Sequence, residues 1–486
     1  MSYHWWKITT FKLVEKYISR AARYKNSDYF ELIVSGLIGV IIGFFVFVYH
    51  ETMIFFLTLY QIITDSQNYI SNRGILLLPI VAFSGGLIIG ILKKTIFRKV
   101  THEGIESVVQ ALVYKDGKIA WGNSFKSIIL SAISIASGGG AGREGPTIVL
   151  GASVGSSISQ ILQLDKQRMR VFSGSGAAAA ISAIFDAPLG GIIFAMEAII
   201  GDVKLKSFAS LVIASISATA TTRILVGNNP LLITPQVANV SLLDMFLLAI
   251  AGITSGFVAI YYLKAYFWTT ILVKDALKKV PQILKPAIGG LLVGILAALL
   301  PTLLESTYQP INNAIRGNGY GLIKLSIFEY LLPLTSNYLH IIIILIVSLL
   351  TLILKPISNA ITIASGSVGG TFAPSIKAGA MYGFVLGLIL SFFIKDINVG
   401  LYAIVCAGAV LSGTFQAPLT GGIILFEITH NYNIILPLIL SSVLSSFIIQ
   451  KFKIRTFNAL QQEIVDDENR LHPMLKIFDE NTRKKD

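Results

Sequence analysis

The chain is poor in charged residues and has almost no cysteine. Charged residues make up 13% of its 486 residues, compared with about 25% in soluble domains, which argues against an ordinary water-soluble protein. The single cysteine, Cys406, excludes a disulfide within the chain and a cysteine metal cluster, and its apolar surroundings are typical of a small packed residue. No nucleophile–base triad, metal cluster or phosphate loop stands out, so we expect no enzyme activity, no metal and no cofactor.

Hydrophobic residues are abundant instead. They account for 54% of the sequence, and the mean hydropathy is +0.72. A bilayer core of about 30 Å is spanned by about 20 apolar residues in a helix, and runs near that length recur at 32–48, 75–92, 242–263, 283–299, 339–354 and 434–449. We therefore expect an all-α integral membrane protein with roughly ten or more helices, many of them tilted, broken or too short to cross alone.

The distribution of basic residues predicts the orientation of the chain in the membrane. Residues 1–27 contain Trp5, Trp6 and several Lys and Arg, a pattern typical of a cytoplasmic amphipathic helix rather than a cleavable signal peptide. Four basic residues lie within positions 93–99, after the second long run. The positive-inside rule then predicts that both termini are cytoplasmic. We interpret the net charge of +13 as a sign of orientation, not of nucleic-acid binding.

Two pairs of segments in the chain repeat each other. Residues 136–146 align without gaps on 364–374, at an offset of 228 (374 − 146), and residues 185–189 match 415–419 at an offset of 230 (418 − 188). Duplicated halves are common in transporters, often in inverted topology, with substrate sites near the midplane where helices are broken. The predicted divisions are an N-terminal helix at 1–27, repeat halves at 28–227 and 242–449, a joint at 228–241, and a cytoplasmic tail with a short final helix at 450–486.

A charged motif lies at the start of one of these broken helices. Glu144 stands between glycines in Gly142-Arg-Glu-Gly-Pro146. A charge inside a bilayer is costly and points to function. The glycines free backbone N–H groups, and the following helix directs its positive end at the same place. The pattern predicts a gate in which Glu144 competes with an anionic substrate, and the alternative is a carboxylate that only caps the helix.

These motifs resemble the signatures of the CLC chloride channel/transporter family. The resemblance rests on Gly142–Pro146, Gly369-Gly-Thr-Phe-Ala-Pro374, Gly176–Ala179 with Asp186–Phe194, and Gly413–Leu419, and it extends over about 35–449. It implies a fold of two inverted-topology repeats and a homodimer with one anion pathway per subunit. It also implies that Glu144 is the gating glutamate and that the anion is bound by backbone amides of Arg143, Glu144, Gly145, Thr371 and Phe372.

Two anion-site positions depart from the family pattern. The loop that usually supplies a central Ser reads His102-Glu-Gly-Ile-Glu106, which places Glu103 at the anion. Glu103 would either be protonated there or, with Glu106, cap the next helix. Phe457 stands where the family has an inner tyrosine, and it would keep an apolar plug without a hydroxyl donor.

The position of the inner proton-relaying glutamate reads Ala198. The neighbouring Glu197 is a candidate relay, but Glu427 is its mate in the second half, which favours a shared structural role for the pair. Proton coupling is therefore open from the sequence.

The resemblance predicts a multi-pass transporter of the plasma or inner membrane. Its expected substrates are chloride or similar monovalent anions, and its mechanism is either that of a voltage-gated-type channel or that of a Cl⁻/H⁺ antiporter, which would add protons as a partner. The other expected partners are the lipid bilayer and a second copy of the chain. Only about 37 residues follow Ile449, fewer than a regulatory domain of about 50 residues requires. The alternatives are a fluoride or other-anion transporter, an organic-solute transporter on an unrelated inverted-repeat fold, and a non-transporting receptor or scaffold.

Overall fold

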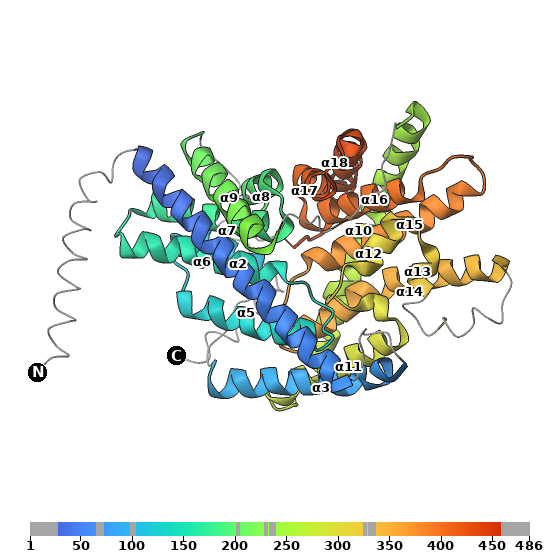
Figure 1. Ribbon diagram of the computed structural model, residues 1–486, viewed down its shortest axis with the longest axis horizontal. Coiled ribbons are helices and arrows are strands. Elements are labelled where there is room, and N and C mark those ends of the chain that lie inside the picture. Colours follow the sequence, from blue (N-terminus) through green and yellow to red (C-terminus); the bar gives the residue numbers. More distant parts are fainter. Residues whose placement is uncertain are drawn as a thin grey trace, which may run out of the picture.

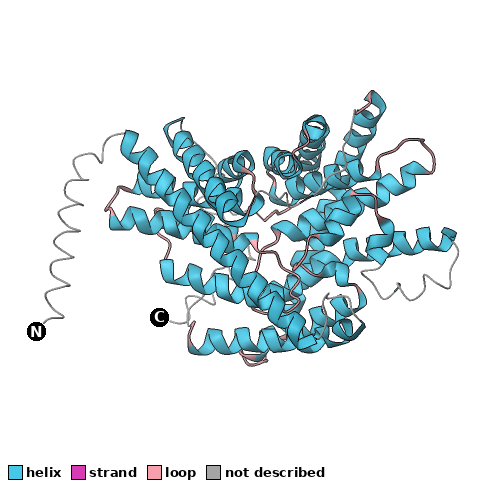
Figure 2. Ribbon diagram, in the orientation of Figure 1, coloured by secondary structure: helices cyan, strands magenta, loops and turns pink. Residues whose placement is uncertain are grey.

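The computed structural model describes residues 28–64, 72–97, 104–200, 205–227, 232, 240–323, 328 and 337–457. Within these ranges the chain is mainly helical, and the β-type pairing is one isolated bridge between Gly142 and Gly370 (Figure 2). Glu103, the predicted helix at 1–27 and most of the tail at 450–486 lie outside the described residues.

The two halves of the chain form two groups of helices. The first half contains α2 (Asp28–Thr64), α3 (Asn72–Thr95), α4 (Ile105–Tyr114), α5 (Trp121–Ala136), α6 (Glu144–Ile161), α7 (Lys166–Phe185), α8 (Pro188–Phe194), a π-helical turn (Ala195–Ile200) and α9 (Leu205–Val226). The second half contains α10 (Leu242–Ala276), α11 (Leu284–Leu299), a 3-10 turn (Pro301–Leu303), α12 (Gln309–Ile315), α13 (Gly319–Ile323), α14 (Asn337–Ala364), α15 (Phe372–Ser391), α16 (Val399–Phe415), α17 (Pro418–Thr429), a 3-10 turn (Tyr432–Ile434) and α18 (Ile435–Lys451).

Several helices are long and apolar enough to cross a bilayer, as the hydrophobic runs predict. Those that qualify by length and composition are Tyr29–Leu59, Leu77–Thr95, Phe208–Val226, Leu242–Ala276, Tyr338–Ala364, Phe372–Ser391 and Tyr432–Lys451. The run at 283–299 was overestimated, because α11 has only 16 residues and a helix rises about 1.5 Å per residue. The spans at 208–226 and 372–391 are not among the apolar runs named from the sequence, because small and polar residues lower their hydropathy.

The chain turns in the same way at equivalent points of the two halves. Asp186 and Gln416 end α7 and α16 in the left-handed conformation, with φ of 56° and 51°. A proline then occupies the first position of the next helix, Pro188 in α8 and Pro418 in α17, where its missing N–H costs no hydrogen bond. The repeat detected in the sequence is thus a repeat of backbone geometry.

A pseudo-two-fold axis relates the halves and passes through the centre of the molecule. Gly142 and Gly370, which are repeat mates, form an antiparallel bridge in which each N–H donates to the other carbonyl, at 2.8 and 2.6 Å. Such mutual pairing of equivalent residues requires that the two segments run in opposite directions, as inverted repeats do. In Figure 1 most of the first half, in blue to green, lies opposite the second half, in yellow-green to red.

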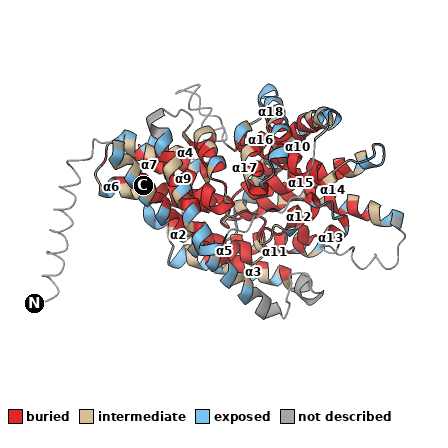
Figure 3. Cartoon of the chain, turned by 45° about the horizontal axis from the view of Figure 1, so that its top comes forward, coloured by how far each residue is buried: buried red, intermediate tan, exposed pale blue. Residues whose placement is uncertain are grey.

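Helices α3 and α11, one from each half, pack side by side (Figure 1). Their contact depends on glycine, because a Cβ on Gly86 would lie 2.1 Å from the Pro286 carbonyl oxygen and one on Gly290 would lie 2.1 Å from that of Ala82. Buried residues concentrate where the two halves meet, and exposed ones lie on the outer helices (Figure 3). The motif residues therefore lie in the most enclosed part of the protein.

Candidate anion site at two opposed helix starts

Helices α6 and α15 begin at the same place, one from each half. Glu144 is the first residue of α6, and Phe372 is the first residue of α15. The bridge between Gly142 and Gly370 holds the two preceding loops together. Each helix start carries a partial positive charge and exposed N–H groups, so this junction favours a negative charge.

Glycine is required where the loops meet. A Cβ on Gly142 would lie 2.3 Å from Oε2 of Glu144, and a Cβ on Gly370 would lie 2.7 Å from the amide nitrogen of Gly145. Real Cβ atoms do not approach other atoms this closely, so the glycines of both motifs allow the two helix starts to converge. The same glycines bring the predicted residues Arg143, Glu144 and Gly145 beside the second-half motif.

The Glu144 side chain lies at this junction and is 0% exposed. Its Oε2 accepts a hydrogen bond from the backbone N–H of Ala373 at 3.4 Å, and its Oε1 accepts one from the Tyr308 hydroxyl at 3.2 Å. The amide that donates to the carboxylate thus belongs to Ala373, one residue beyond the predicted pair of Thr371 and Phe372. A negative charge at this point receives donors from the opposite half of the molecule.

Arg143 and Tyr308 lie next to this carboxylate. The Arg143 guanidinium carbon is 5.2 Å from the centre of the Tyr308 ring, within the range of a cation–π contact. Arg143 precedes α6 and Tyr308 precedes α12. The sequence motifs pointed to Arg143 but gave no reason to single out Tyr308.

Glu305, Lys355 and Lys377 form a buried ionic cluster near the junction of α6 and α15. Nζ of Lys355 in α14 and Nζ of Lys377 in α15 lie 2.5 and 3.2 Å from Oε1 of Glu305, and both lysine side chains are 0% exposed. Lys355 also donates to the carbonyl of Gly140, at 3.3 Å. Two lysines and one glutamate leave a formal excess of positive charge near Glu144. Sequence reasoning overlooked this cluster, although a lysine inside an apolar helix is itself a signal of function.

Aromatic rings connect Phe372 to Phe457. Phe372 is fully buried and its ring centre lies 5.3 Å from that of Phe185, 5.6 Å from Phe194 and 5.3 Å from Phe415. Phe415 is in turn 5.2 Å from Phe457, which is 6% exposed. The structure thus places Phe457 in one aromatic row with Phe372, two ring contacts away from the start of α15.

Glu197 and Glu427 form a reciprocal pair of helix caps. Glu197 accepts hydrogen bonds from the backbone N–H groups of Leu419 and Thr420 at 3.1 and 2.9 Å, and from the Thr420 hydroxyl. Glu427 accepts from the N–H groups of Leu189 and Gly190 at 3.0 and 2.6 Å. Each carboxylate therefore satisfies the start of the equivalent helix in the other half, which is the shared structural role that the repeat suggested.

Ala198, at the position of the inner glutamate, is fully buried. It lies in the π-helical turn Ala195–Ile200, whereas the equivalent part of the second half continues as the regular helix α17. The prediction for Glu103 has no structural counterpart here because that residue is outside the described ranges. The described chain resumes at Gly104, and α4 starts at Ile105 with Glu106 in its first turn.

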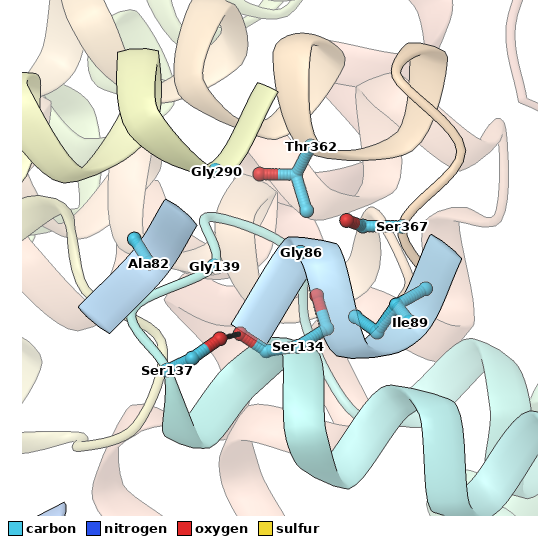
Figure 4. A pocket seen from close by; sticks show the side chains of 9 residues that line it. All are labelled: Ala82, Gly86, Ile89, Ser134, Ser137, Gly139, Gly290, Thr362 and Ser367. Atoms are coloured by element: carbon cyan, nitrogen blue, oxygen red, sulfur yellow. Dashed lines mark hydrogen bonds between the residues drawn. The ribbon is translucent and has the colours of Figure 1, made fainter. Parts of the chain in front are cut away.

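A small cavity lies between segments of the two halves, and Glu144 does not line it. Its volume is about 10 Å³, and it is lined by Ala82, Gly86, Ile89, Ser134, Ser137, Gly139, Gly290, Thr362 and Ser367 (Figure 4). Ser134 and Thr362 are repeat mates, as are Gly139 and Ser367, so the cavity marks the meeting of equivalent loops. It has room for about one water molecule and no charged lining, so we do not assign it to an anion.

The fold and the junction define a multi-pass membrane protein built from inverted repeats, with two broken helices meeting at a buried carboxylate. Residues 85–450 match the family described as voltage gated chloride channel, and the chain belongs to this family. It is 27% identical over 377 residues to a ClcB-like chloride channel protein of Ralstonia nicotianae, which covers 75% of this chain and 80% of that protein. It is 29% identical over 313 residues to the H(+)/Cl(-) exchange transporter ClcA of Vibrio cholerae, which covers 62% of this chain and 61% of that protein.

Solved structures share the fold. A slow cyanobacterial Cl-/H+ antiporter superposes with a TM-score of 0.73 at 20% identity, over 90% of this chain and 99% of that one. A CLC-type fluoride/proton antiporter superposes with a TM-score of 0.64 at 19% identity, over 87% and 97%. These likenesses establish the all-α, CLC-type architecture of two inverted-topology repeats.

Proposed function

We propose that this protein moves chloride or similar monovalent anions across the plasma membrane through a pathway gated by Glu144. The observation that carries the proposal is a fully buried carboxylate at the meeting point of two helix starts, bonded to an amide of the opposite half. An anion would be stabilised by the same N–H groups and helix ends. Neutral dipoles can replace its hydration shell without binding it too tightly for release.

The ionised Glu144 is the closed state in this proposal. Protonation removes the negative charge that the helix starts and the Ala373 amide favour, so the side chain leaves and an anion enters. Arg143, Gly145, Thr371 and Phe372 supply the surrounding backbone. Flux therefore rises as the pH falls, because the gate opens when Glu144 gains its proton.

Flux from proteoliposomes under a chloride gradient, with external pH recorded at the same time, tests both the substrate and its coupling. Glu144→Gln mimics the protonated gate, so we expect it to pass chloride without pH dependence. A Glu144→Gln protein that keeps the wild-type pH profile would remove Glu144 from the gate. A flux of organic solutes without any anion flux would favour the unrelated-transporter alternative.

The external pH recorded in this assay distinguishes a channel from an exchanger, because only an exchanger moves protons in exchange for chloride. ClcA is an exchange transporter by name, which supports a Cl⁻/H⁺ antiporter, whereas Ala198 in place of an inner carboxylate supports weak, absent or rerouted coupling. Uphill proton movement driven by a chloride gradient at a fixed ratio would identify an exchanger. The fluoride/proton antiporter fold makes fluoride the first competing anion to measure.

The proposal also covers the oligomeric state of the protein and its orientation in the membrane. We infer a homodimer with a pathway in each subunit, repeat halves at 28–227 and 242–449, and cytoplasmic termini as the basic residues predict. Cross-linking in native membranes would test the dimer, and protease access to a C-terminal tag in sealed vesicles would test the orientation.

A further inference from the structure

Tyr308 contacts Glu144 but belongs neither to the start of α6 nor to the start of α15. Its hydroxyl donates to Oε1 of Glu144 at 3.2 Å, while its ring lies beside the Arg143 guanidinium. Tyr308 has intermediate exposure and Glu144 has none. The tyrosine thus lies nearer the accessible surface than the carboxylate that it contacts.

The segment that carries Tyr308 is fixed by the buried ionic cluster. Lys355 donates to the carbonyl of Leu303 at 2.6 Å, and Lys377 donates to that of Leu304. The next residue, Glu305, binds both ammonium groups through its side chain. The backbone four and five residues before Tyr308, and the side chain three residues before it, are therefore anchored to α14 and α15.

The same cluster anchors the loop that carries Glu144. Lys355 donates to the Gly140 carbonyl at 3.3 Å, and Gly140 donates its N–H to the Thr362 hydroxyl at 3.0 Å. Both partners of the hydrogen bond between Tyr308 and Glu144 are thus held against α14. The segments that carry the hydroxyl and the carboxylate are therefore held close to each other.

We propose that Tyr308 is a latch that holds Glu144 in the closed position through its hydroxyl. A hydroxyl that donates to an ionised carboxylate forms a charge-assisted bond, stronger than one to a neutral group, so the latch stabilises the ionised gate selectively. This inference rests on the proposed gating role of Glu144. Lys355, Glu305 and Lys377 act as positioning residues for the latch.

Other charged or titratable groups act on Glu144 and stay in place when the Tyr308 hydroxyl is removed. The charged ones are Arg143 before α6, Glu305 before α12, Lys355 from α14 and Lys377 from α15. Tyr49 from α2 also lies near Glu144, but its hydroxyl is paired with Ser131 and a tyrosine is neutral from acid to neutral pH. Tyr308→Phe keeps the ring and removes only the hydroxyl, which contacts both Glu144 and Arg143.

Chloride flux of the full chain in proteoliposomes, measured from acid to neutral pH, tests the latch. Without the donor, the ionised gate is less stable and Glu144 binds its proton at a higher pH. We expect Tyr308→Phe to move the midpoint of the flux profile up by about one pH unit, equivalent to about tenfold in proton concentration. Flux at neutral pH should rise several-fold.

Tyr49→Phe is the matched control, because Tyr49 is also buried and its hydroxyl pairs with Ser131 at 2.6 Å instead of with Glu144. We expect its midpoint to stay at the wild-type pH. In a Glu144→Gln background, Tyr308→Phe should have no further effect on the pH profile.

The outcomes separate the latch from the gate. If Glu144→Gln abolishes the pH dependence and Tyr308→Phe leaves the midpoint unchanged, the latch is wrong and the gate stands. An equal shift in Tyr49→Phe also overturns the latch, because the effect is then not specific to this hydroxyl. If Glu144→Gln retains the wild-type profile, the gate assignment itself fails, and the latch fails with it.

Discussion

The two halves place different side chains at equivalent helix starts. The first half begins α6 with Glu144, a carboxylate, and the second begins α15 with Phe372, an aromatic ring. At the α8 and α17 crossing, by contrast, both halves carry the same residue, as Glu197 and Glu427. The comparison teaches that identical residues at equivalent positions, such as Glu197 and Glu427, stabilise the fold. Different residues at equivalent positions, such as Glu144 and Phe372, mark the gate.

The largest expected effects come from substitutions of Phe372 and Glu144, the first residues of α15 and α6. Phe372 packs against three phenylalanine rings, so Phe372→Ala should lower the free energy of unfolding by about 3–5 kcal/mol, measured by thermal unfolding in detergent. It should nevertheless retain pH-dependent chloride flux. Glu144→Ala should do the reverse, folding well and losing the pH dependence.

Phe392→Ala serves as the control for the loss of a ring, because Phe392 ends the same helix with 59% exposure. Its effect on stability should stay within about 0.5 kcal/mol. If Phe372→Ala removed the pH dependence as completely as Glu144→Ala does, the two helix starts would share the gating role and the contrast between them would be lost.

Smaller effects on stability are expected for Glu197 and Glu427, the positions at which both halves carry a glutamate. Glu197→Gln and Glu427→Gln each replace a carboxylate that accepts two backbone N–H bonds, and each should cost about 1–3 kcal/mol of stability. The two losses should be similar, and the ratio of proton to chloride movement should be unchanged in both. Unequal behaviour, with proton movement lost in Glu197→Gln alone, would make Glu197 a relay.

The smallest effect concerns the sequence departure at Glu103. If this residue faces the anion, two like charges repel at short range, and chloride binds more tightly as the pH falls. Glu103→Ser should then strengthen binding several-fold near neutral pH and flatten its pH dependence, as measured by calorimetric titration at two pH values. Glu106→Gln is the control, and identical affinities in wild type and Glu103→Ser would place Glu103 off the pathway.

Much of the architecture could be read from the sequence because it depends on local patterns. Apolar runs predicted the long helices, and the repeated Gly/Pro motifs predicted where helices break and which segments meet. The pairing of Glu197 with Glu427 was also visible in their common spacing from a proline. Their exchange across the axis was not visible, because it depends on how two distant segments cross.

The rest of the candidate site could not be predicted for the same physical reason. Tyr308 contacts Glu144 across a separation of 164 residues, and no motif or period connects them. The ion cluster of Glu305, Lys355 and Lys377 likewise assembles from three elements. The hydrogen bond from the amide of Ala373 to Glu144 was also not predicted, because it depends on side-chain geometry that the motif leaves open. The assignment of the Thr371 and Phe372 amides to the anion stays a prediction.

The helix caps that the two halves exchange, Glu197 and Glu427, affect the order in which the protein assembles during synthesis. The N–H groups of Leu189 and Gly190 find their acceptor only in Glu427, which is 237 residues further along the chain from Gly190. At synthesis rates of about 5–20 residues per second, this helix start waits roughly 12–50 s for its partner. Until then the first half carries an uncapped helix end inside the membrane, so its assembly is completed only when the last part of the second half has been inserted.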